Sequence, residues 1–189
     1  MKKAIFIDRD GTLIEETGYL KMLQDILFTS KAIAALQIFR ELGYLNIVIT
    51  NQSAVARGIL SPKELHKIHV RLKALAKQEG ATIDDIFFCP HLPPPAGRVA
   101  PYNIECDCRK PKPGLLLQAK EKYHLDLGQS VVVGDKPSDM ELARAAGAKA
   151  ALVMTGYGAT TQLEWKDQVA AYSNLHEFAC RLAEKNLIV

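Results

Sequence analysis

Short apolar segments alternate with amphipathic helical segments along this chain, and that order limits the available folds more than any other feature. The apolar segments cover residues 2–8, 45–50, 82–89, 130–135 and 149–155. The helical segments cover residues 31–44, 61–80, about ten residues from position 113, and 138–147. Such alternation predicts a doubly wound, Rossmann-like α/β fold in which helices cover both faces of a parallel sheet.

Two of the predicted helices have clear start signals. Ser61 and Glu64 have the spacing of a capping box, and Asn174 and Glu177 repeat that spacing near the end of the chain. The second pair predicts a last helix that continues to about Lys185.

Composition and charge exclude several classes of protein. The 189 residues, 48% of them apolar, suit a single domain over residues 1–189. The net charge of +3, from 24 basic and 21 acidic residues without a basic block, disfavours nucleic acid as a partner. No segment reaches the ~18 apolar residues that span a bilayer, and the short apolar run near Met1 does not resemble a signal peptide. We therefore expect a cytoplasmic monomer without a membrane partner.

The predicted strands end in residues that can carry chemistry. In parallel sheets, ligands bind beyond the carboxyl ends of the strands, near the point where the strand order reverses. The strand ends here are Asp8, Thr50, Cys89 and Asp135, and each of them opens a polar loop. The sequence therefore places a candidate site at this edge of the sheet.

The first strand ends in D-R-D-G-T, with Asp8 and Asp10 separated by one residue. A tight turn accounts for Asp10 and Gly11, but a second carboxylate at a buried strand end is costly unless it meets a cation. Paired carboxylates fit a magnesium site, because Mg2+ prefers oxygen ligands. A carboxylate can also act as a nucleophile and form an aspartyl-phosphate.

Three further motifs accompany D-R-D-G-T. They are I-T-N-Q-S at 49–53, C-R-K-P-K-P-G at 108–114 and V-V-V-G-D-K-P-S-D at 131–139. The order of acid, hydroxyl, lysine and acid at successive strand ends resembles the haloacid dehalogenase superfamily of phosphatases over residues 3–155.

The resemblance implies a role for each matching residue. Asp8 is the expected nucleophile, and Asp10 the expected acid and base that serves the leaving alkoxide and then the water. Thr50 and Lys110 are expected to bind the transferring phosphoryl group, since phosphoryl transfer depends mainly on positioning and charge stabilisation. The implied Mg2+ ligands are the Asp8 carboxylate, the Asp10 carbonyl oxygen and Asp135.

Two features differ from many superfamily members. Lys136 stands where a second acid often follows the strand, so Asp139 is expected to support the site and Lys136 to contact substrate. About forty residues separate Asp8 from Thr50, too few for a separate cap domain once a helix and a strand are subtracted. Loops must then select the substrate.

The loop over residues 89–108 contains Cys89, His91, Cys106 and Cys108 in a C-x-H-x14-C-x-C pattern. Three thiols and one imidazole match a closed tetrahedral zinc site, and a structural Zn2+ would order a loop that has little apolar sequence. Buried apolar thiols are one alternative, and a disulfide, which would leave an odd thiol, is another. The cytosol is reducing, which favours the metal.

A zinc loop before R-K-P resembles two related groups, the histidinol-phosphate phosphatases and the D-glycero-D-manno-heptose 1,7-bisphosphate 7-phosphatases. The 14-residue span and the E-E-T-G-Y-L segment at 15–20 favour the heptose group. That resemblance implies Mg-dependent removal of the C7 phosphate in the synthesis of ADP-heptose for lipopolysaccharide core. The implied substrate contacts are Glu16, Thr17, Gly18, Tyr19, Asn51, Gln52, Ser53, Arg109 and Lys136.

Other functions remain open at this stage. Histidinol phosphate or a nucleic-acid 3'-phosphate end are alternative substrates, and a catalytically inactive, zinc-stapled binding module is an alternative from another class. Outside the motifs, we expect His66 and His69 to lie on or beside a solvated helix face. We expect Cys180 to be a small core residue.

Overall fold

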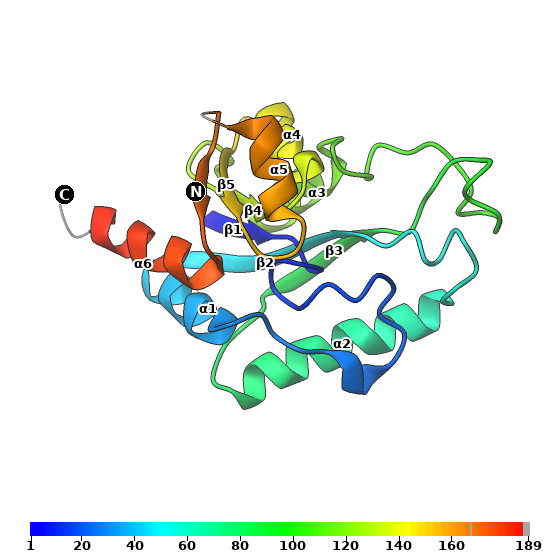
Figure 1. Cartoon of the computed structure of the whole chain (residues 1–189), viewed down its shortest axis with the longest axis horizontal. Helices are drawn as coiled ribbons and strands as arrows, with labels where there is room; N and C mark the ends of the chain where they lie inside the picture. The colour runs from blue at the N-terminus through cyan, green and yellow to red at the C-terminus, as the bar shows by residue number, and fades with distance from the viewer. Residues whose placement is uncertain (167, 187–189) are drawn as a thin grey trace.

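Six parallel strands form one sheet in the order β3-β2-β1-β4-β5-β6 (Figure 1). The structure is a computed structural model, and it describes residues 1–166 and 168–186. The strands are β1 (Lys3–Ile7), β2 (Tyr44–Asn51), β3 (Asp85–Cys89), β4 (Val131–Gly134), β5 (Lys149–Val153) and β6 (Ala170–Tyr172). Strands β1, β2 and β3 follow one another toward one edge of the sheet, and β4, β5 and β6 follow one another toward the other edge. The predicted doubly wound α/β fold is confirmed, and its switch point lies between β1 and β4.

The helices cover both faces of the sheet. They are α1 (Ala32–Glu41), α2 (Pro62–Gln78), α3 (Gly114–Tyr123), α4 (Pro137–Ala146), α5 (Gly158–Trp165) and α6 (Leu175–Asn186), with a short 3-10 helix η1 (Leu23–Asp25). The sequence patterns did not predict α5 or β6. Only Gly158 and Thr161 of α5 are buried, so this helix has no apolar stripe, and β6 is three residues long.

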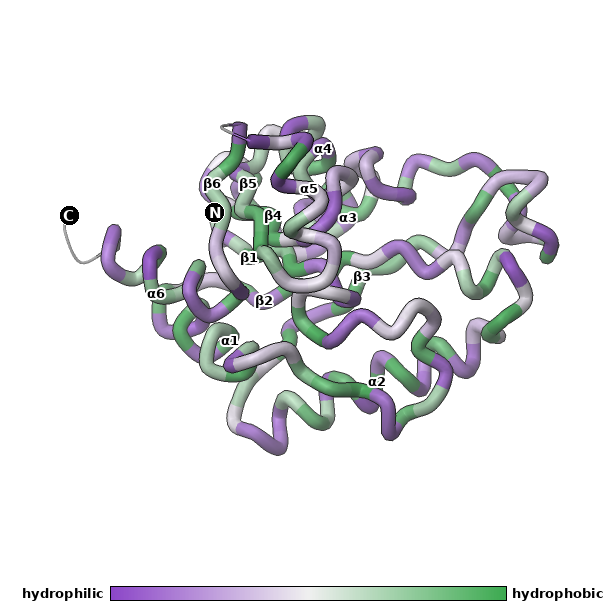
Figure 2. Tube along the Cα trace, viewed as in Figure 1, coloured by the Kyte–Doolittle hydropathy of each residue, from purple (hydrophilic) through white to green (hydrophobic). Residues whose placement is uncertain are grey.

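Alternating side chains of β1 supply both halves of the core. Ile5 and Ile7 pack in a cluster with residues of α1, α2 and α6, whereas Ala4 and Phe6 pack with residues of α3 and α4. Figure 2 shows hydrophobic residues along the central strands and an alternation of hydrophobic and hydrophilic residues along α2 and α6. This is the pattern of a sheet buried on both faces by amphipathic helices.

The capping prediction is right for one helix and half right for the other. Ser61 Oγ accepts from Glu64 N at 3.2 Å, and the Glu64 carboxylate accepts from Ser61 N at 2.7 Å. Asn174 Oδ1 accepts from Glu177 N at 2.9 Å, but the Glu177 carboxylate accepts from Ser173 N. The reciprocal bond of α6 is therefore displaced by one residue.

The segment between β1 and α1 folds over the carboxyl ends of the strands without a cap domain. Within residues 8–31, η1 is the only helix of the described structure. Among the described residues, no helix has both the length and the apolar content needed to cross a membrane. The site is consequently formed by loops at the edge of the sheet.

Candidate active site

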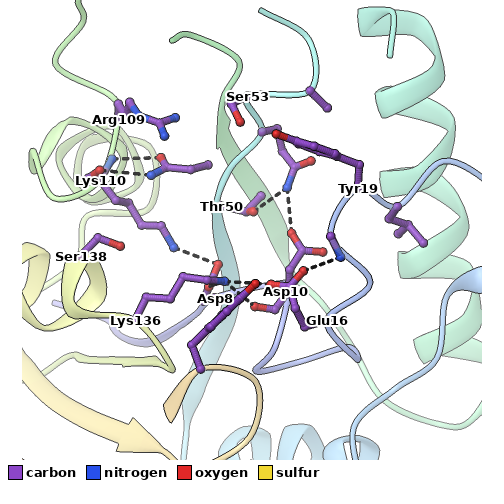
Figure 3. Close-up of a pocket in the computed structure, with 16 residues that line it drawn as sticks. Asp8, Asp10, Glu16, Tyr19, Thr50, Ser53, Arg109, Lys110, Lys136 and Ser138 are labelled. Carbon is purple, nitrogen blue, oxygen red and sulfur yellow. Dashed lines mark hydrogen bonds and ion pairs between the residues drawn. The ribbon is translucent and has the colours of Figure 1, made fainter. Parts of the chain in front are cut away.

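Asp8 lies directly after β1, where its backbone N–H donates to Val133 O of β4 at 2.9 Å. Its carboxylate is buried, with Oδ1 2.8 Å from Lys110 Nζ and 2.8 Å from Arg9 N. Burial alone would raise the pKa of Asp8, but the Lys110 and Lys136 ammonium groups outweigh burial and hold that pKa below its usual range. Asp8 is therefore ionised and available as a nucleophile (Figure 3).

Lys110 is held at both its main chain and its side chain. Asn51 Nδ2 donates to Lys110 O at 3.1 Å, and Lys110 N donates to Asn51 Oδ1 at 3.0 Å. The ammonium group lies 2.6 Å from Asp139 Oδ1 in addition to its contact with Asp8. Burial lowers the pKa of Lys110, but the charges of Asp139 and Asp8 raise it further, so this lysine is charged. Asp139 thus contacts Lys110 from outside the cavity lining.

Three oxygens that the sequence predicts as Mg2+ ligands converge on one point. Lys136 Nζ lies 3.0 Å from the Asp10 carbonyl oxygen, 3.6 Å from Asp8 Oδ2 and 3.6 Å from Asp135 Oδ1. Burial, followed by the charge of Asp8, raises the pKa of Asp135 to about 7. Two buried carboxylates and a carbonyl oxygen that share one cation are a donor set that fits Mg2+.

Gly11 allows Asp135 to approach the first strand. Its φ of +87° is unfavourable for residues with a side chain, and a Cβ there would overlap the Asp135 carboxylate. The glycine of the D-R-D-G-T motif is thus required by both the turn and the neighbouring acid.

The side-chain amide of Gln52 bridges Thr50 and Asp10. Thr50 is buried at the end of β2, and its Oγ1 accepts from Gln52 Nε2 at 2.8 Å. The same Nε2 donates to Asp10 Oδ2 at 3.0 Å, while Asp10 Oδ1 lies 2.9 Å from Arg9 Nη2. Sequence reasoning expected Gln52 to contact substrate and assigned no role to Arg9.

A cavity of about 570 Å³ opens above these groups. It is lined by Asp8, Asp10, Glu16, Gly18, Tyr19, Leu20, Thr50, Asn51, Gln52, Ser53, Ala54, Arg109, Lys110, Lys136, Ser138 and Tyr157. Within the described structure, Thr17 is the predicted substrate contact that lies outside this lining, and Asp135 is buried and does not line the cavity. Sequence reasoning missed Leu20, Ala54, Ser138 and Tyr157. Tyr157 follows β5, so inspection of that strand end would have found it.

Cys89 at the end of β3 and three residues of the loop that follows, His91, Cys106 and Cys108, form a second cluster, separate from the acids. Cys89 Sγ lies 3.5 Å from Cys106 Sγ, and Cys108 Sγ lies 3.4 Å from Cys106 Sγ and 3.3 Å from His91 Nδ1. Ligand atoms at these separations can all contact one tetrahedral metal. Burial raises the pKa of the Cys89 thiol, so a cation is required to hold it as thiolate. The donor set fits Zn2+.

The Arg109 side chain couples this loop to the cavity. Arg109 Nη1 donates to the carbonyl oxygen of His91 at 3.1 Å, and Arg109 directly follows Cys108 in the chain. Arg109 is therefore linked to the Cys/His cluster both through the main chain and through this hydrogen bond.

Comparisons with known proteins found relatives of this chain. The family model described as HAD-hydrolase-like matches residues 107–177. A D-glycero-alpha-D-manno-heptose-1,7-bisphosphate 7-phosphatase of Photorhabdus laumondii subsp. laumondii is 42% identical over 156 residues, which cover 82% of this chain and 84% of that protein. The chain belongs to this phosphatase family. The corresponding Escherichia coli K12 enzyme, named for the beta anomer, is 37% identical over 163 residues, covering 85% of this chain and 84% of that one.

A solved structure supports this membership in the heptose-bisphosphatase family. The D,D-heptose 1,7-bisphosphate phosphatase of B. bronchiseptica, complexed with magnesium and phosphate, superposes with a TM-score of 0.86. It is 28% identical, and the alignment covers 97% of this chain and 99% of that one. The haloacid dehalogenase-like fold that the motifs predict is confirmed.

Two expectations about residues outside the motifs need correction in this family member. His69 was expected on or beside a solvated face, but it is buried, because α2 turns it toward Arg9 and Phe88. Cys180 was expected in the core, but it is only partly buried and lies 3.8 Å from His176 Nε2 on the outer part of α6. His66 is exposed as expected.

Proposed function

We propose that this chain is a Mg-dependent phosphatase that removes the C7 phosphate of D-glycero-D-manno-heptose 1,7-bisphosphate and leaves heptose 1-phosphate. The observation that carries the proposal is the ionised Asp8 beside Lys110, facing a cavity in a chain about 40% identical to several named heptose bisphosphatases. The product is a precursor of ADP-heptose for lipopolysaccharide core.

Two half-reactions use the two acids after β1. In the first, an Asp8 oxygen forms a bond to phosphorus, the bond from phosphorus to the C7 oxygen breaks, and Asp10 gives its proton to that oxygen. In the second, water forms the new bond to phosphorus, Asp10 takes up its proton, and the bond to Asp8 breaks. Inorganic phosphate leaves, and both acids return to their starting states.

The transferring phosphoryl group is bound by fixed donors. Lys110 Nζ lies at hydrogen-bond distance from Asp8 and faces the oxygens of a phosphoryl group that is bound there. The Thr50 hydroxyl accepts from Gln52, which leaves its own proton free for a phosphoryl oxygen. Asp8, Asp135 and the Asp10 carbonyl oxygen would hold Mg2+, which when bound supplies positive charge to the phosphoryl oxygens.

The second phosphate of the substrate requires a cationic group away from Asp8. In Figure 3, Arg109 and Ser53 lie at one end of the cavity, while Asp8, Asp10 and Lys136 lie at the other. An arginine fork suits a phosphate that is recognised but not cleaved. We assign Arg109 to the C1 phosphate, with Ser53 beside it. Glu16, Gly18, Tyr19 and Lys136 then line the sugar.

Zinc has a structural role in this proposal. Four protein ligands leave no open position for water or substrate, so Zn2+ at Cys89, His91, Cys106 and Cys108 orders the loop and places Arg109. We further propose a single-domain monomer that works in the cytoplasm, where reducing conditions keep these thiols free for the metal.

Phosphate release from three esters tests the assignment. The wild type should release one phosphate from heptose 1,7-bisphosphate far faster than from histidinol phosphate, and 31P NMR should show the C1 phosphate retained. Asp8→Asn should abolish turnover and the phosphoenzyme at matched Mg2+. Arg109→Ala should raise KM for the bisphosphate more than for a simple monophosphate ester.

Faster phosphate release from histidinol phosphate would show that histidinol phosphate, not the heptose bisphosphate, is the substrate. Normal turnover by Asp8→Asn would remove the nucleophile from the scheme. Equal KM effects of Arg109→Ala on both esters would show that Arg109 does not bind the C1 phosphate.

A further inference from the structure

Arg9 stands between the two catalytic acids and is one of the most deeply buried side chains in the described structure, with 1% of its surface exposed. A buried guanidinium is costly unless nearly all of its donors are satisfied. Its partners come from three segments: Asp10 beside it, Gln52 after β2, and His69 on α2. The family motifs explain the acids on either side and leave this arginine without a role.

Both oxygens of the Asp10 carboxylate are held. Oδ1 accepts from Arg9 Nε at 3.0 Å and lies 2.9 Å from Arg9 Nη2, and Oδ2 accepts from Gln52 Nε2 at 3.0 Å. Arg9 Nη2 also donates to Gln52 Oε1 at 3.0 Å, so the arginine fixes which end of the amide faces Asp10. The ring closed by these three residues leaves Asp10 little rotational freedom, while its carboxyl group still lines the cavity.

His69 anchors the remaining end of the guanidinium. Its Nε2 lies 3.3 Å from Arg9 Nη1 and can accept from it only when the imidazole is neutral. Burial, and then the charge of Arg9, lower the pKa of His69 to about 3, so the acceptor form is present at neutral pH. This contact links Arg9 to α2.

We infer that Arg9 and Gln52 form a clamp that orients the Asp10 carboxyl group for proton transfer, with His69 holding Arg9 in place. These are positioning residues, because they act through Asp10: Arg9 and His69 do not line the cavity, and the Gln52 amide that does line it donates to Asp10. The inference rests on the proposed function, in which Asp10 protonates the leaving oxygen and later deprotonates water. Gln52 also positions the Thr50 hydroxyl through the second hydrogen of the same amide.

Two substrates with different leaving groups can distinguish a clamp that orients Asp10 from a general structural role. A sugar alkoxide is strongly basic and needs the proton of Asp10, whereas p-nitrophenolate leaves without one. In Gln52→Met, which keeps the volume but loses the amide, kcat for the heptose bisphosphate should fall about 10²-fold with KM little changed. With p-nitrophenyl phosphate, the rate of the first turnover should fall far less than bisphosphate turnover, because only the lost hydrogen bond to Thr50 affects it. A burst of about one nitrophenolate per active site should follow, since water attack on the phosphoenzyme still needs Asp10 as a base.

Arg9→Lys is the second variant, because it keeps the charge and loses the fork. Its matched control is Arg40→Lys, where the arginine pairs with Asp84 on the exposed surface at 2.8 Å. Arg9→Lys should reproduce the Gln52→Met kinetics, and Arg40→Lys should behave as wild type. If Arg9→Lys does not fold, Gln52→Met alone decides the matter.

A burst rate that falls as far as bisphosphate turnover, or a bisphosphate kcat that stays at the wild-type value, overturns the clamp. A wild type that cleaves p-nitrophenyl phosphate but not the bisphosphate refutes the proposed substrate only, and the burst still tests the clamp. A wild type that cleaves neither ester refutes both proposals.

Discussion

The buried imidazole of His69 should make the stability of this protein fall in acid, and one substitution isolates the effect. Burial, together with the Arg9 guanidinium, lowers its pKa from the usual 6.5 to about 3. Between these values the unfolded chain binds a proton at this position and the folded chain does not. The stabilising contribution is therefore complete above pH 6.5 and is lost as the pH falls toward 3.

The magnitude follows from the two pKa values. At pH 5 the unfolded imidazole titrates about 1.5 units above the solution pH, and each unit is worth about 1.4 kcal/mol, so the loss is about 2 kcal/mol. At pH 7.5 the loss is close to zero. His69 is 7% exposed, so solvent screening reduces this value little. His69→Gln keeps an oxygen acceptor for Arg9 and cannot titrate.

Urea unfolding followed by far-UV circular dichroism at both pH values measures the effect. Between about pH 7.5 and about pH 5, the free energy of unfolding of the wild type should fall about 2 kcal/mol more than that of His69→Gln. The raised pKa values of Asp135 and Asp139 act in the opposite direction, because the folded state binds protons there, but they are common to both proteins. Parallel losses in the two proteins would refute the buried neutral imidazole.

Two further predictions concern the metals. Purified wild type should contain about one tightly held zinc per chain. Cys106→Ala should lose this zinc and keep the far-UV spectrum of the wild type, since the loop contributes little to the core. A wild type that contains no zinc and has freely titratable thiols would contradict this prediction. Lys136→Met should bind Mg2+ at least about tenfold more tightly in calorimetric titrations, because the substitution removes a cation that lies 3.6 Å from both Asp8 and Asp135. An unchanged Kd for Mg2+ would show that Lys136 does not compete with the metal.

The strands could be predicted wherever apolar residues are contiguous, as in β1 and β4. Convergence of Asp8, Thr50 and Asp135 also followed from the sequence, because parallel strands deliver their carboxyl ends to one edge whatever the loops between them do. The edge elements α5 and β6 could not be predicted, since neither buries enough apolar surface to leave a periodic pattern.

The neighbours of the motifs escaped prediction for a different reason. In the sequence, Arg9 is only a charged residue between two acids. Its burial depends on a contact with His69, which is 60 residues away on a helix whose exposed face carries His66. The Asn51 side chain lines the cavity, and its two hydrogen bonds with the main chain of Lys110 were not predicted. Pairings of this kind depend on side-chain geometry across elements, which no local spacing encodes.

In the proposed scheme, a zinc ligand, a substrate-binding arginine and the catalytic lysine are the three consecutive residues 108–110, yet the contacts that hold Arg109 and Lys110 differ. Arg109 is held by the carbonyl oxygen of His91, within the zinc loop. Lys110 has its own anchors in Asn51 and Asp139, which belong to β2 and α4. Loss of zinc should therefore displace Arg109 before it displaces Lys110. Cys106→Ala should accordingly raise KM for the bisphosphate more than it lowers kcat, and equal effects on both would mean that the metal supports the catalytic lysine directly.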